Sequence, residues 1–335
     1  MADWKPDVLA DEFEQLTLDL GEDDEGPVFA TLVRALPHEQ SWWDVLRARR
    51  GPLDDVDVLY VHGWSDYFFQ KRLARFWTAR GARFFALDLR KYGRSLRDAQ
   101  TPGYVTSLTT YDEDIAAALE AMGRGTEGIA STRRLVLLGH STGGLTLSLW
   151  ASRHPGTADA VILNSPWLEF QVASARPLIA PVAELQARWA PREVAPQVDL
   201  GFYTRAQQEV ADPDDPVDIN LAWRPAQTMA VHAGWFHAVL TGHAAVAAGL
   251  AIDAPVCVLL SARSATPTRW SEDLTRADSV LVVDDIARAA LKLGASVTVE
   301  RIDGALHDVF LSRHEAREEA YRRLDRWVRG WSAAG

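Results

Sequence analysis

Residues 135–144 place one serine among small residues, in the order Leu-Val-Leu-Leu-Gly-His-Ser-Thr-Gly-Gly. The apolar residues before this serine indicate a buried strand, and those at 145, 147, 149 and 150 indicate a helix after it. A sharp strand-to-helix turn exposes a serine hydroxyl and places it beside the free N–H groups of the helix N-terminus. Ser141, in Gly139-x-Ser141-x-Gly143, is therefore the expected nucleophile of an acyl-transfer reaction.

A serine nucleophile needs a histidine base, an acid that orients this base, and an oxyanion hole. His307 is the best candidate base, because it follows a strand pattern and a small-residue turn in Ile302-Asp-Gly-Ala-Leu-His307. That position corresponds to the carboxyl end of a strand, where parallel sheets place their sites. The expected order along the chain is serine, acid, histidine.

The acid is expected in the loop that follows the strand predicted at 256–260. That stretch holds five candidate carboxylates, namely Glu272, Asp273, Asp278, Asp284 and Asp285. Asp284 and Asp285 fall in the first turns of a predicted helix, where the helix dipole favours carboxylates without any catalytic role. Asp278 precedes that helix and is the preferred acid, while the other four remain alternatives.

Two backbone N–H groups are expected to form the oxyanion hole. One belongs to Thr142, directly after the nucleophile, and the other follows the strand predicted at 56–61. This strand leads into His62-Gly63-Trp64, where the glycine allows a tight turn, so the N–H of Trp64 is the expected second donor. His62 is interpreted as a buried polar residue that holds this turn, not as a second base.

Strand and helix patterns alternate along the chain, which predicts an α/β fold with a mainly parallel sheet flanked by helices. Strands are expected at 28–33, 56–61, 83–87, 135–138, 160–163, 256–260 and 297–302. Helices are expected at about 68–79, 111–122 and 142–154, and near the C-terminus. Residues 1–26, which are acidic, are expected to form a peripheral arm, with the core at 27–164 and 254–335.

Residues 165–253 interrupt this alternation with eight prolines and eight aromatic residues. An insertion of this length between two strands is expected to lie over one edge of the sheet as a helical cap, or lid. Its aromatic side chains would give a substrate cavity apolar walls. Trp167, Trp235 and Phe236 are the expected substrate contacts.

The 335-residue chain has a net charge of −11, which argues against nucleic-acid partners and against electrostatic docking on anionic lipid. Its N-terminus lacks the basic-then-apolar order of a signal peptide, and no run of about 18 apolar residues predicts a transmembrane segment. Cys257 is the single cysteine, so no internal disulfide is expected. These features predict a cytoplasmic protein.

Two patterns that could indicate a cofactor are interpreted otherwise. The G-x-G-x-x-G pattern at Gly123–Gly128 follows a helix and precedes a strand, the reverse of the order in dinucleotide-binding sites. His232, His237 and His243 are five and six residues apart, which is not the spacing of a helical metal pair. No metal and no organic cofactor is expected.

Four motifs together resemble the α/β-hydrolase superfamily. They are His62-Gly63, the segment from Asp88 to Ser95 that ends in Gly93-Arg-Ser, the Gly139–Gly144 run, and the late Asp278/His307 pair. They are most similar to the monoacylglycerol lipase and lysophospholipase-like branch, which includes serine-aminopeptidase-type hydrolases. The resemblance implies a Ser–Asp–His triad and a helical cap over an acyl pocket.

The chain departs from that family in two places. Lys91-Tyr92 replaces the usual Gly-His, and Ser261–Ala277 separates the acid from its strand. The second departure bears on the choice of Asp278 more than on the choice of serine or histidine.

The expected function is that of a serine hydrolase that cleaves small-molecule carboxylic esters with an apolar acyl group through an acyl-enzyme. Two alternatives remain. An amide or peptide hydrolase would need an acidic group in the lid to bind a substrate ammonium, for which Glu169 and Glu184 are available. A non-catalytic binding protein on the same scaffold would not require a serine, a histidine and an acid together.

Overall fold

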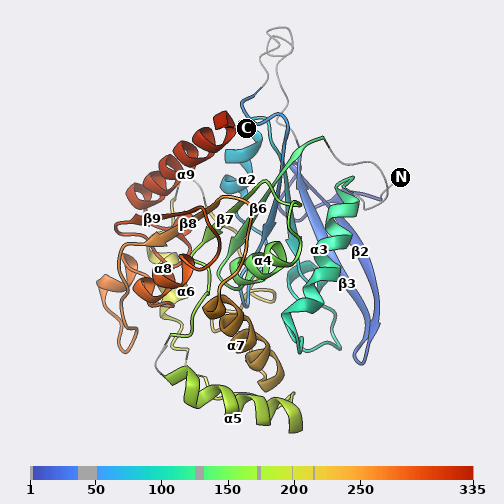
Figure 1. The fold of residues 1–335 in the computed structure, drawn as a ribbon, viewed down its shortest axis with the longest axis vertical. Helices are drawn as coiled ribbons and strands as arrows, with labels where there is room; N and C mark the ends of the chain where they lie inside the picture. Colours follow the sequence, from blue (N-terminus) through green and yellow to red (C-terminus); the bar gives the residue numbers. More distant parts are fainter. Residues whose placement is uncertain are drawn as a thin grey trace.

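A computed structural model describes residues 3–36, 51–124, 132–171, 175–197, 199–213 and 216–334. Within these residues the strands form one twisted sheet in the order β1-β2-β3-β5-β4-β6-β7-β8-β9 (Figure 1). The strands are β1 (Lys5–Pro6), β2 (Phe13–Asp23), β3 (Gly26–Ala35), β4 (Val56–Val61), β5 (Arg83–Asp88), β6 (Arg134–His140), β7 (Ala160–Asn164), β8 (Val256–Ser261) and β9 (Val297–Ile302). The strands from β4 to β9 run parallel, whereas β1, β2 and β3 form an antiparallel edge.

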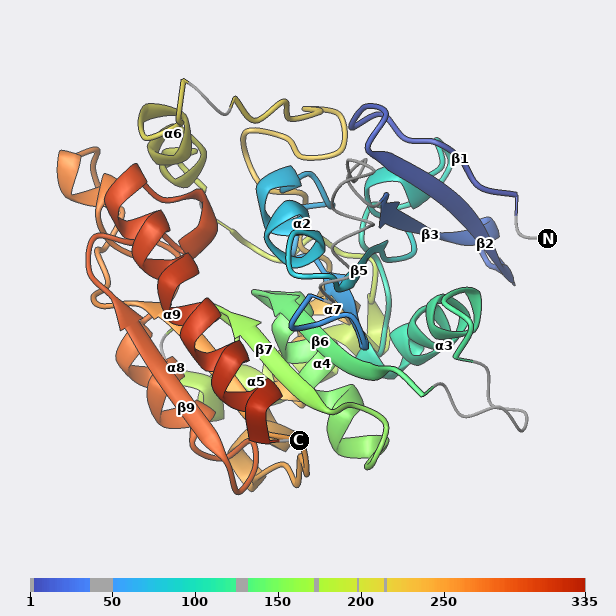
Figure 2. The same ribbon diagram turned by 90° about the horizontal axis from the view of Figure 1, so that it is seen from above.

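Helices cover both faces of the sheet, which confirms the predicted α/β architecture (Figure 2). The helices of the described residues are α2 (Lys71–Thr78), α3 (Tyr111–Ala121), α4 (Thr142–Arg153), α5 (Arg176–Trp189), α6 (Phe202–Glu209), α7 (Ala233–Ala248), α8 (Val283–Ala290) and α9 (His314–Ala334). Residues of α3, α4, α7 and α8 belong to the apolar core on one face, and residues of α2 and α9 to the core on the other. None of the described helices is long and apolar enough to cross a bilayer.

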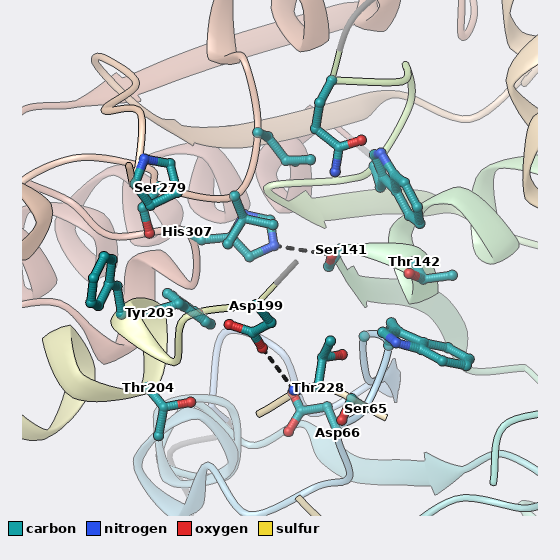
Figure 3. A pocket seen from close by; sticks show the side chains of 18 of the residues that line it. Ser65, Asp66, Ser141, Thr142, Asp199, Tyr203, Thr204, Thr228, Ser279 and His307 are labelled. Atoms are coloured by element: carbon teal, nitrogen blue, oxygen red, sulfur yellow. Dashed lines mark hydrogen bonds between the residues drawn. The ribbon is translucent and has the colours of Figure 1, made fainter. Parts of the chain in front are cut away.

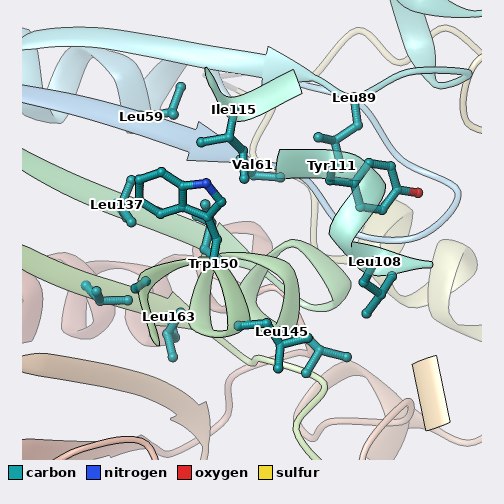
Figure 4. Packing of buried hydrophobic residues seen from close by; sticks show 14 of the residues in the cluster. Leu59, Val61, Leu89, Leu108, Tyr111, Ile115, Leu137, Leu145, Trp150 and Leu163 are labelled. Carbon is teal, nitrogen blue, oxygen red and sulfur yellow. The ribbon is translucent and has the colours of Figure 1, made fainter. Parts of the chain in front are cut away.

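The central strands are buried on both faces, because successive side chains of a strand point to opposite sides. In β4, Leu59 and Val61 pack in the core beneath α3 and α4, whereas Val58 and Tyr60 pack in the core beneath α2 and α9. Figure 4 shows Leu59 and Val61 in the first core, together with Trp150 of α4. This double burial explains why the central strands read as continuous apolar runs.

The expectation of a peripheral arm at residues 1–26 is wrong for most of its length. Phe13–Asp23 is a strand of the sheet and pairs with β3, for example through Leu16 and Leu32. The buried carboxylate of Asp7 also binds the guanidinium of Arg94, with Oδ2 2.6 Å from Nε. The N-terminal segment is therefore anchored both to the sheet edge and to the Gly93-Arg-Ser turn.

Two further expectations concern the Gly123–Gly128 pattern and the segment between β7 and β8. Gly123 and Arg124 follow α3 in a turn, and the remainder of the Gly123–Gly128 pattern lies outside the described residues. The segment between β7 and β8 holds α5, α6 and α7, of which α5 packs on α7 below the sheet in Figure 1.

Candidate active site

Ser141 lies at the junction of β6 and α4 in a strained backbone conformation, with φ at 52° and ψ at −116°. Such a conformation costs a non-glycine residue on the order of 1–3 kcal/mol, so its surroundings must hold it. The Ser141 N–H donates to the carbonyl of Asn164 (3.0 Å), and its carbonyl accepts from the N–H groups of Leu145 (3.2 Å) and Trp167 (3.0 Å). These contacts from the end of β7, from the loop after β7 and from α4 fix the serine in its turn.

Close packing around this turn explains the small residues of the motif. A Cβ on Gly143 would lie 2.3 Å from the carbonyl oxygen of His62, too close for any side chain. A Cβ on Gly63 would lie 3.0 Å from the Cβ of Ser141. The chain after β4 therefore runs directly past the serine, which brings the backbone of Trp64 to the site.

Ser141, His307 and Asp278 form a hydrogen-bonded line, as Figure 3 shows for the first two. His307 Nε2 is 3.0 Å from Ser141 Oγ, and His307 Nδ1 is 2.9 Å from Asp278 Oδ2. The exposed fractions are 9% for Ser141, 3% for His307 and 0% for Asp278. Since a carboxylate only accepts hydrogen bonds, it favours the proton on Nδ1 and leaves Nε2 free to accept the serine proton.

Asp278 is the one candidate acid that the structure brings to His307. Its second oxygen, Oδ1, accepts from the N–H groups of Val280 (2.7 Å) and Leu281 (2.8 Å), which fixes the carboxylate plane. The four other candidates form ion pairs with arginines away from the histidine, namely Glu272 with Arg276, Asp273 with Arg263, Asp284 with Arg301 and Asp285 with Arg288.

The residues that separate Asp278 from β8 form a loop whose two ends are joined by backbone hydrogen bonds. The N–H of Ala265 donates to the carbonyl of Asp278 (2.8 Å), and the N–H of Asp278 donates to the carbonyl of Arg263 (3.1 Å). These bonds pair Ser264 and Asp278 as a short parallel bridge. The chain thus leaves the end of β8 and returns to it, which reconciles the inserted residues with the position of the acid.

The two expected oxyanion donors, the N–H groups of Thr142 and Trp64, lie beside the hydrogen-bonded line of Ser141, His307 and Asp278. Thr142 is the first residue of α4, and both residues line the cavity beside Ser141. Among the described residues, neither N–H donates to another protein atom. His62 holds the turn before Trp64, because its Nδ1 lies 2.7 Å from the carbonyl of Gly63 and its Nε2 accepts from the N–H of Leu89 (3.1 Å).

A cavity of about 700 Å³ opens onto Ser141 and His307. Its apolar wall includes Trp64, Trp167 and Trp235, and the ring of Trp235 lies on that of Trp64 with centroids 3.7 Å apart. Phe236 was expected in this wall but is absent from it; its ring packs against Phe170 instead. The structure therefore places two of the three predicted aromatic contacts at the cavity.

Polar side chains that sequence reasoning missed line another part of the cavity, including Asp66, Asp199, Tyr203, Thr204 and Thr228 (Figure 3). Arg224 also lines it, and its Nε is 2.9 Å from Asp66 Oδ1, an ion pair that lacks hydrogen-bond geometry. Burial raises the pKa of Asp66 to about 6 despite this guanidinium. Asp66 directly follows the Trp64 turn, but no sequence pattern connects it to Arg224.

Asp308 is a second buried carboxylate that the sequence did not single out, although it is the neighbour of His307. It accepts hydrogen bonds from Asn164 Nδ2 (2.7 Å), from the N–H of Phe310 (3.0 Å) and from Gln70 Nε2 (3.3 Å). It therefore ties the histidine loop to the end of β7. Burial lowers the pKa of the adjacent His140, whose ring centroid is 5.0 Å from that of His307.

Comparison with known proteins supports the fold and the family. A monoacylglycerol lipase of Mycolicibacterium smegmatis is 26% identical over 159 residues, which are 46% of this chain and 52% of the relative. The chain thus spans about half the length of the curated relative that it matches. A crystal structure of Paleococcus ferrophilus monoacylglycerol lipase has 20% identity and a TM-score of 0.60, covering 82% of this chain and 94% of that one.

A second solved structure extends the same likeness over nearly the whole chain. A soluble variant of monoglyceride lipase from Saccharomyces cerevisiae, in complex with a substrate analog, has 15% identity and a TM-score of 0.60. It covers 95% of this chain and 96% of that one. At these identities the likeness establishes the α/β-hydrolase fold.

The family is established by a sequence match over more than half of the chain. Residues 55–263 match the family model described as serine aminopeptidase, S33. This range contains β4 to β8, the Ser141 turn and the segment between β7 and β8. The chain belongs to the serine aminopeptidase S33 family and has the α/β-hydrolase fold.

Proposed function

We propose that this chain is a serine hydrolase that cleaves carboxylic esters with an apolar acyl group through an acyl-enzyme intermediate. The observation that carries the proposal is the line of Ser141, His307 and Asp278, of which Ser141 and His307 line a cavity of about 700 Å³. A buried carboxylate, a buried imidazole and a hydroxyl that faces a cavity, within hydrogen-bond distance of one another, are what nucleophilic acyl transfer needs.

In the first half of the reaction, Ser141 Oγ attacks the ester carbonyl while its proton passes to His307 Nε2. Asp278 keeps the proton of the neutral imidazole on Nδ1 and stabilises the imidazolium that forms. The imidazolium then gives its Nε2 proton to the alcohol oxygen as the carbon–oxygen bond breaks. In the second half, His307 activates a water molecule, which hydrolyses the acyl-serine by the same route.

The negative charge on the carbonyl oxygen is held by the N–H groups of Trp64 and Thr142 in this mechanism. The close approach of Gly63 to Ser141 supports this assignment, because it carries the Trp64 backbone past the nucleophile. Removal of one oxyanion donor typically lowers kcat by about 100–1,000-fold. A backbone donor has the further advantage that no side-chain rotamer must be ordered.

Residues 165–253 act as a cap over a core formed by 27–164 and 254–335 together with strand β2 of the N-terminal segment. Trp167 and Trp235 from this segment line the cavity together with Trp64, which supports an apolar acyl pocket. The similar proteins named as monoacylglycerol lipases support an ester substrate of this class. Buried apolar area contributes roughly 25 cal/mol per Å², so such walls favour an acyl chain over a charged group.

The amide-hydrolase alternative finds less support in the cap. Glu169 is paired with Arg176 (3.5 Å), Glu184 lies exposed on α5, and neither lines the cavity. Two other acids do line it: Asp199 of the cap, which accepts from the N–H groups of Gly201 (2.8 Å) and Thr228 (2.7 Å), and Asp66, which already faces Arg224. An ammonium group of a peptide substrate would compete with this guanidinium.

The proposal is tested by labelling with a fluorophosphonate and by rates on p-nitrophenyl esters and aminoacyl anilides. Ser141→Ala should lose both labelling and ester hydrolysis while it keeps the fold. Ser279→Ala removes another hydroxyl that lines the cavity and should keep both. A labelled, active Ser141→Ala variant would refute the nucleophile, and efficient anilide cleavage with poor ester cleavage would favour the alternative.

A further inference from the structure

The turn between β2 and β3 carries three acidic residues, Asp23, Asp24 and Glu25, that bind two cations from elsewhere in the chain. Lys91, with 2% of its side chain exposed, has its Nζ 2.5 Å from Asp23 Oδ2 and 2.6 Å from Glu25 Oε2. Arg192 has Nη2 2.5 Å from Asp24 Oδ2 and Nη1 2.5 Å from Glu25 Oε1. Glu25 is thus the residue that bridges both cations.

Glu25 is held as a partly buried, charged acceptor. It also accepts hydrogen bonds from Thr101 Oγ1 (2.5 Å) and the Thr101 N–H (3.2 Å). Burial alone would raise its pKa, but the hydrogen bonds from Lys91 and Thr101 lower this pKa to about 2. The guanidinium of Arg192 lies 4.5 Å from the centre of the Tyr104 ring, which further fixes its position.

Arg192 connects this bridge to the start of α7. The carbonyls of the residues on either side of it accept from the first turn of α7, Pro191 from Gly234 (2.8 Å) and Glu193 from Ala233 (2.9 Å). The next residue of α7 is Trp235, whose ring lies on Trp64 in the cavity wall. A shift of Arg192 would therefore move this ring.

Lys91 connects the bridge to the other side of the same wall. It is followed by Tyr92, whose ring meets Trp64 edge to face with centroids 5.8 Å apart. The carbonyl of Lys91 accepts from the N–H of Gly103 (2.9 Å), and a Cβ on Gly103 would lie 2.7 Å from Trp64 Cζ3. Lys91 and Arg192 thus lie next to segments that contact Trp64 from two directions.

We propose that Glu25 is a positioning residue for the acyl pocket: by bridging Lys91 and Arg192, it holds Trp235 of the cap against Trp64. This inference rests on the proposed ester hydrolase activity. It gives a role to two features that the triad leaves unexplained, the acidic N-terminal hairpin and the lysine that replaces the usual family residue. Loss of the bridge loosens the Trp64–Trp235 wall and leaves Ser141, His307 and Asp278 in place.

The test compares Glu25→Gln with Glu22→Gln, an exposed acid of the same hairpin, in the full chain. Values of kcat and KM are measured for p-nitrophenyl acetate and p-nitrophenyl octanoate. Glu25→Gln should raise KM for the octanoate by about threefold or more, with kcat within about twofold and acetate hydrolysis unchanged. Glu22→Gln should match the wild type on both esters.

Arg192→Gln removes the same bridge from the more exposed partner and keeps the test valid if Glu25→Gln fails to fold. It should reproduce the octanoate-specific rise in KM, and the double variant should be no worse than either single variant. An unchanged KM, or equal losses on both esters, overturns the positioning role. A wild-type protein that hydrolyses neither ester and resists fluorophosphonate labelling overturns the proposed function instead.

Discussion

Asp278→Asn is the most demanding test of the proposed triad, because the hydrogen bonds around residue 278 determine the orientation of the new amide. Asp278 Oδ1 accepts from two backbone N–H groups, of Val280 and Leu281. The carbonyl oxygen of an asparagine must take that place, since an NH₂ group cannot accept. The NH₂ group then faces Nδ1 of His307, which lies 2.9 Å from the other carboxylate oxygen.

This orientation reverses the tautomer of the histidine. An amide that donates to Nδ1 requires a lone pair there, so the ring proton moves to Nε2 and points at Ser141 Oγ. The imidazole can then no longer accept the serine proton. In a serine-protease triad the same change lowers kcat by about 10,000-fold, equivalent to roughly 5.5 kcal/mol of transition-state stabilisation.

The assay is the kcat for hydrolysis of a medium-chain p-nitrophenyl ester, with circular dichroism as a check of the fold. Asp284→Asn is the matched control, since Asp284 lies in the first turn of α8, pairs with Arg301 and should keep kcat within about twofold. If Asp278→Asn retains more than about 1% of the wild-type kcat, the tautomer argument fails. Loss of activity in Asp284→Asn alone would place the acid elsewhere.

Three further predictions concern stability and specificity. Ser141→Gly should be more stable than Ser141→Ala by about 1 kcal/mol in urea unfolding. Glycine adopts the φ of 52° without strain, and this gain exceeds the additional chain entropy that glycine loses on folding. Equal unfolding midpoints of the two variants would mean that the turn is unstrained. Values of kcat/KM should rise from acetyl to medium-chain esters, since each buried methylene contributes roughly 0.8 kcal/mol, and a preference for acetyl over all longer chains would contradict an acyl pocket. The stability that Glu25 adds, compared with glutamine at this position, should be full above pH 4.5, the ordinary value of the glutamate pKa. It should decline toward pH 2, because the pKa of Glu25 in the folded state is about 2. If the urea midpoints of the wild type and Glu25→Gln differ by the same amount from about pH 7 to 3, this prediction is wrong.

The parts of the fold that depend on local pattern were predictable from the sequence. The turn at Ser141 is encoded within a few residues, since an apolar strand, small residues and a helix follow one another directly. The position of Phe236 was also open to local reasoning, because it follows Trp235 on a helix. Consecutive helical residues point about 100° apart, so both rings could not face one cavity.

In the N-terminal hairpin, the acidic charge obscured the alternating pattern of a strand. Leu16, Leu18 and Leu20 alternate with polar residues as a half-buried strand does, but the acidic charge of the segment suggested an arm. Charge describes the solvent face of an edge strand, whereas the alternation describes its pairing. The alternation was therefore the better guide.

Contacts between distant segments could not be predicted, because one sequence does not reveal which loops meet. The loop that returns Asp278 to β8 is closed by two backbone hydrogen bonds, which leave no trace in side-chain pattern. The pairing of Arg224 with Asp66 joins the cap to the Trp64 turn in the same way. Contacts of this kind determine which polar groups face the cavity, and therefore which substrates fit, more than the positions of the helices and strands do.

The order of the strands has a consequence for when the proposed activity would first arise during protein synthesis. Ser141 and His307 are 166 residues apart, and the strands up to β7 precede the acid and the base in the chain. At about 5–20 residues per second, translation takes roughly 8–33 seconds to pass from one to the other. For that interval the growing chain carries the proposed nucleophile without the proposed base. Because β8 and β9 join the sheet at one edge, bringing Asp278 and His307 with them, the proposed ester cleavage would report that the sheet has been completed.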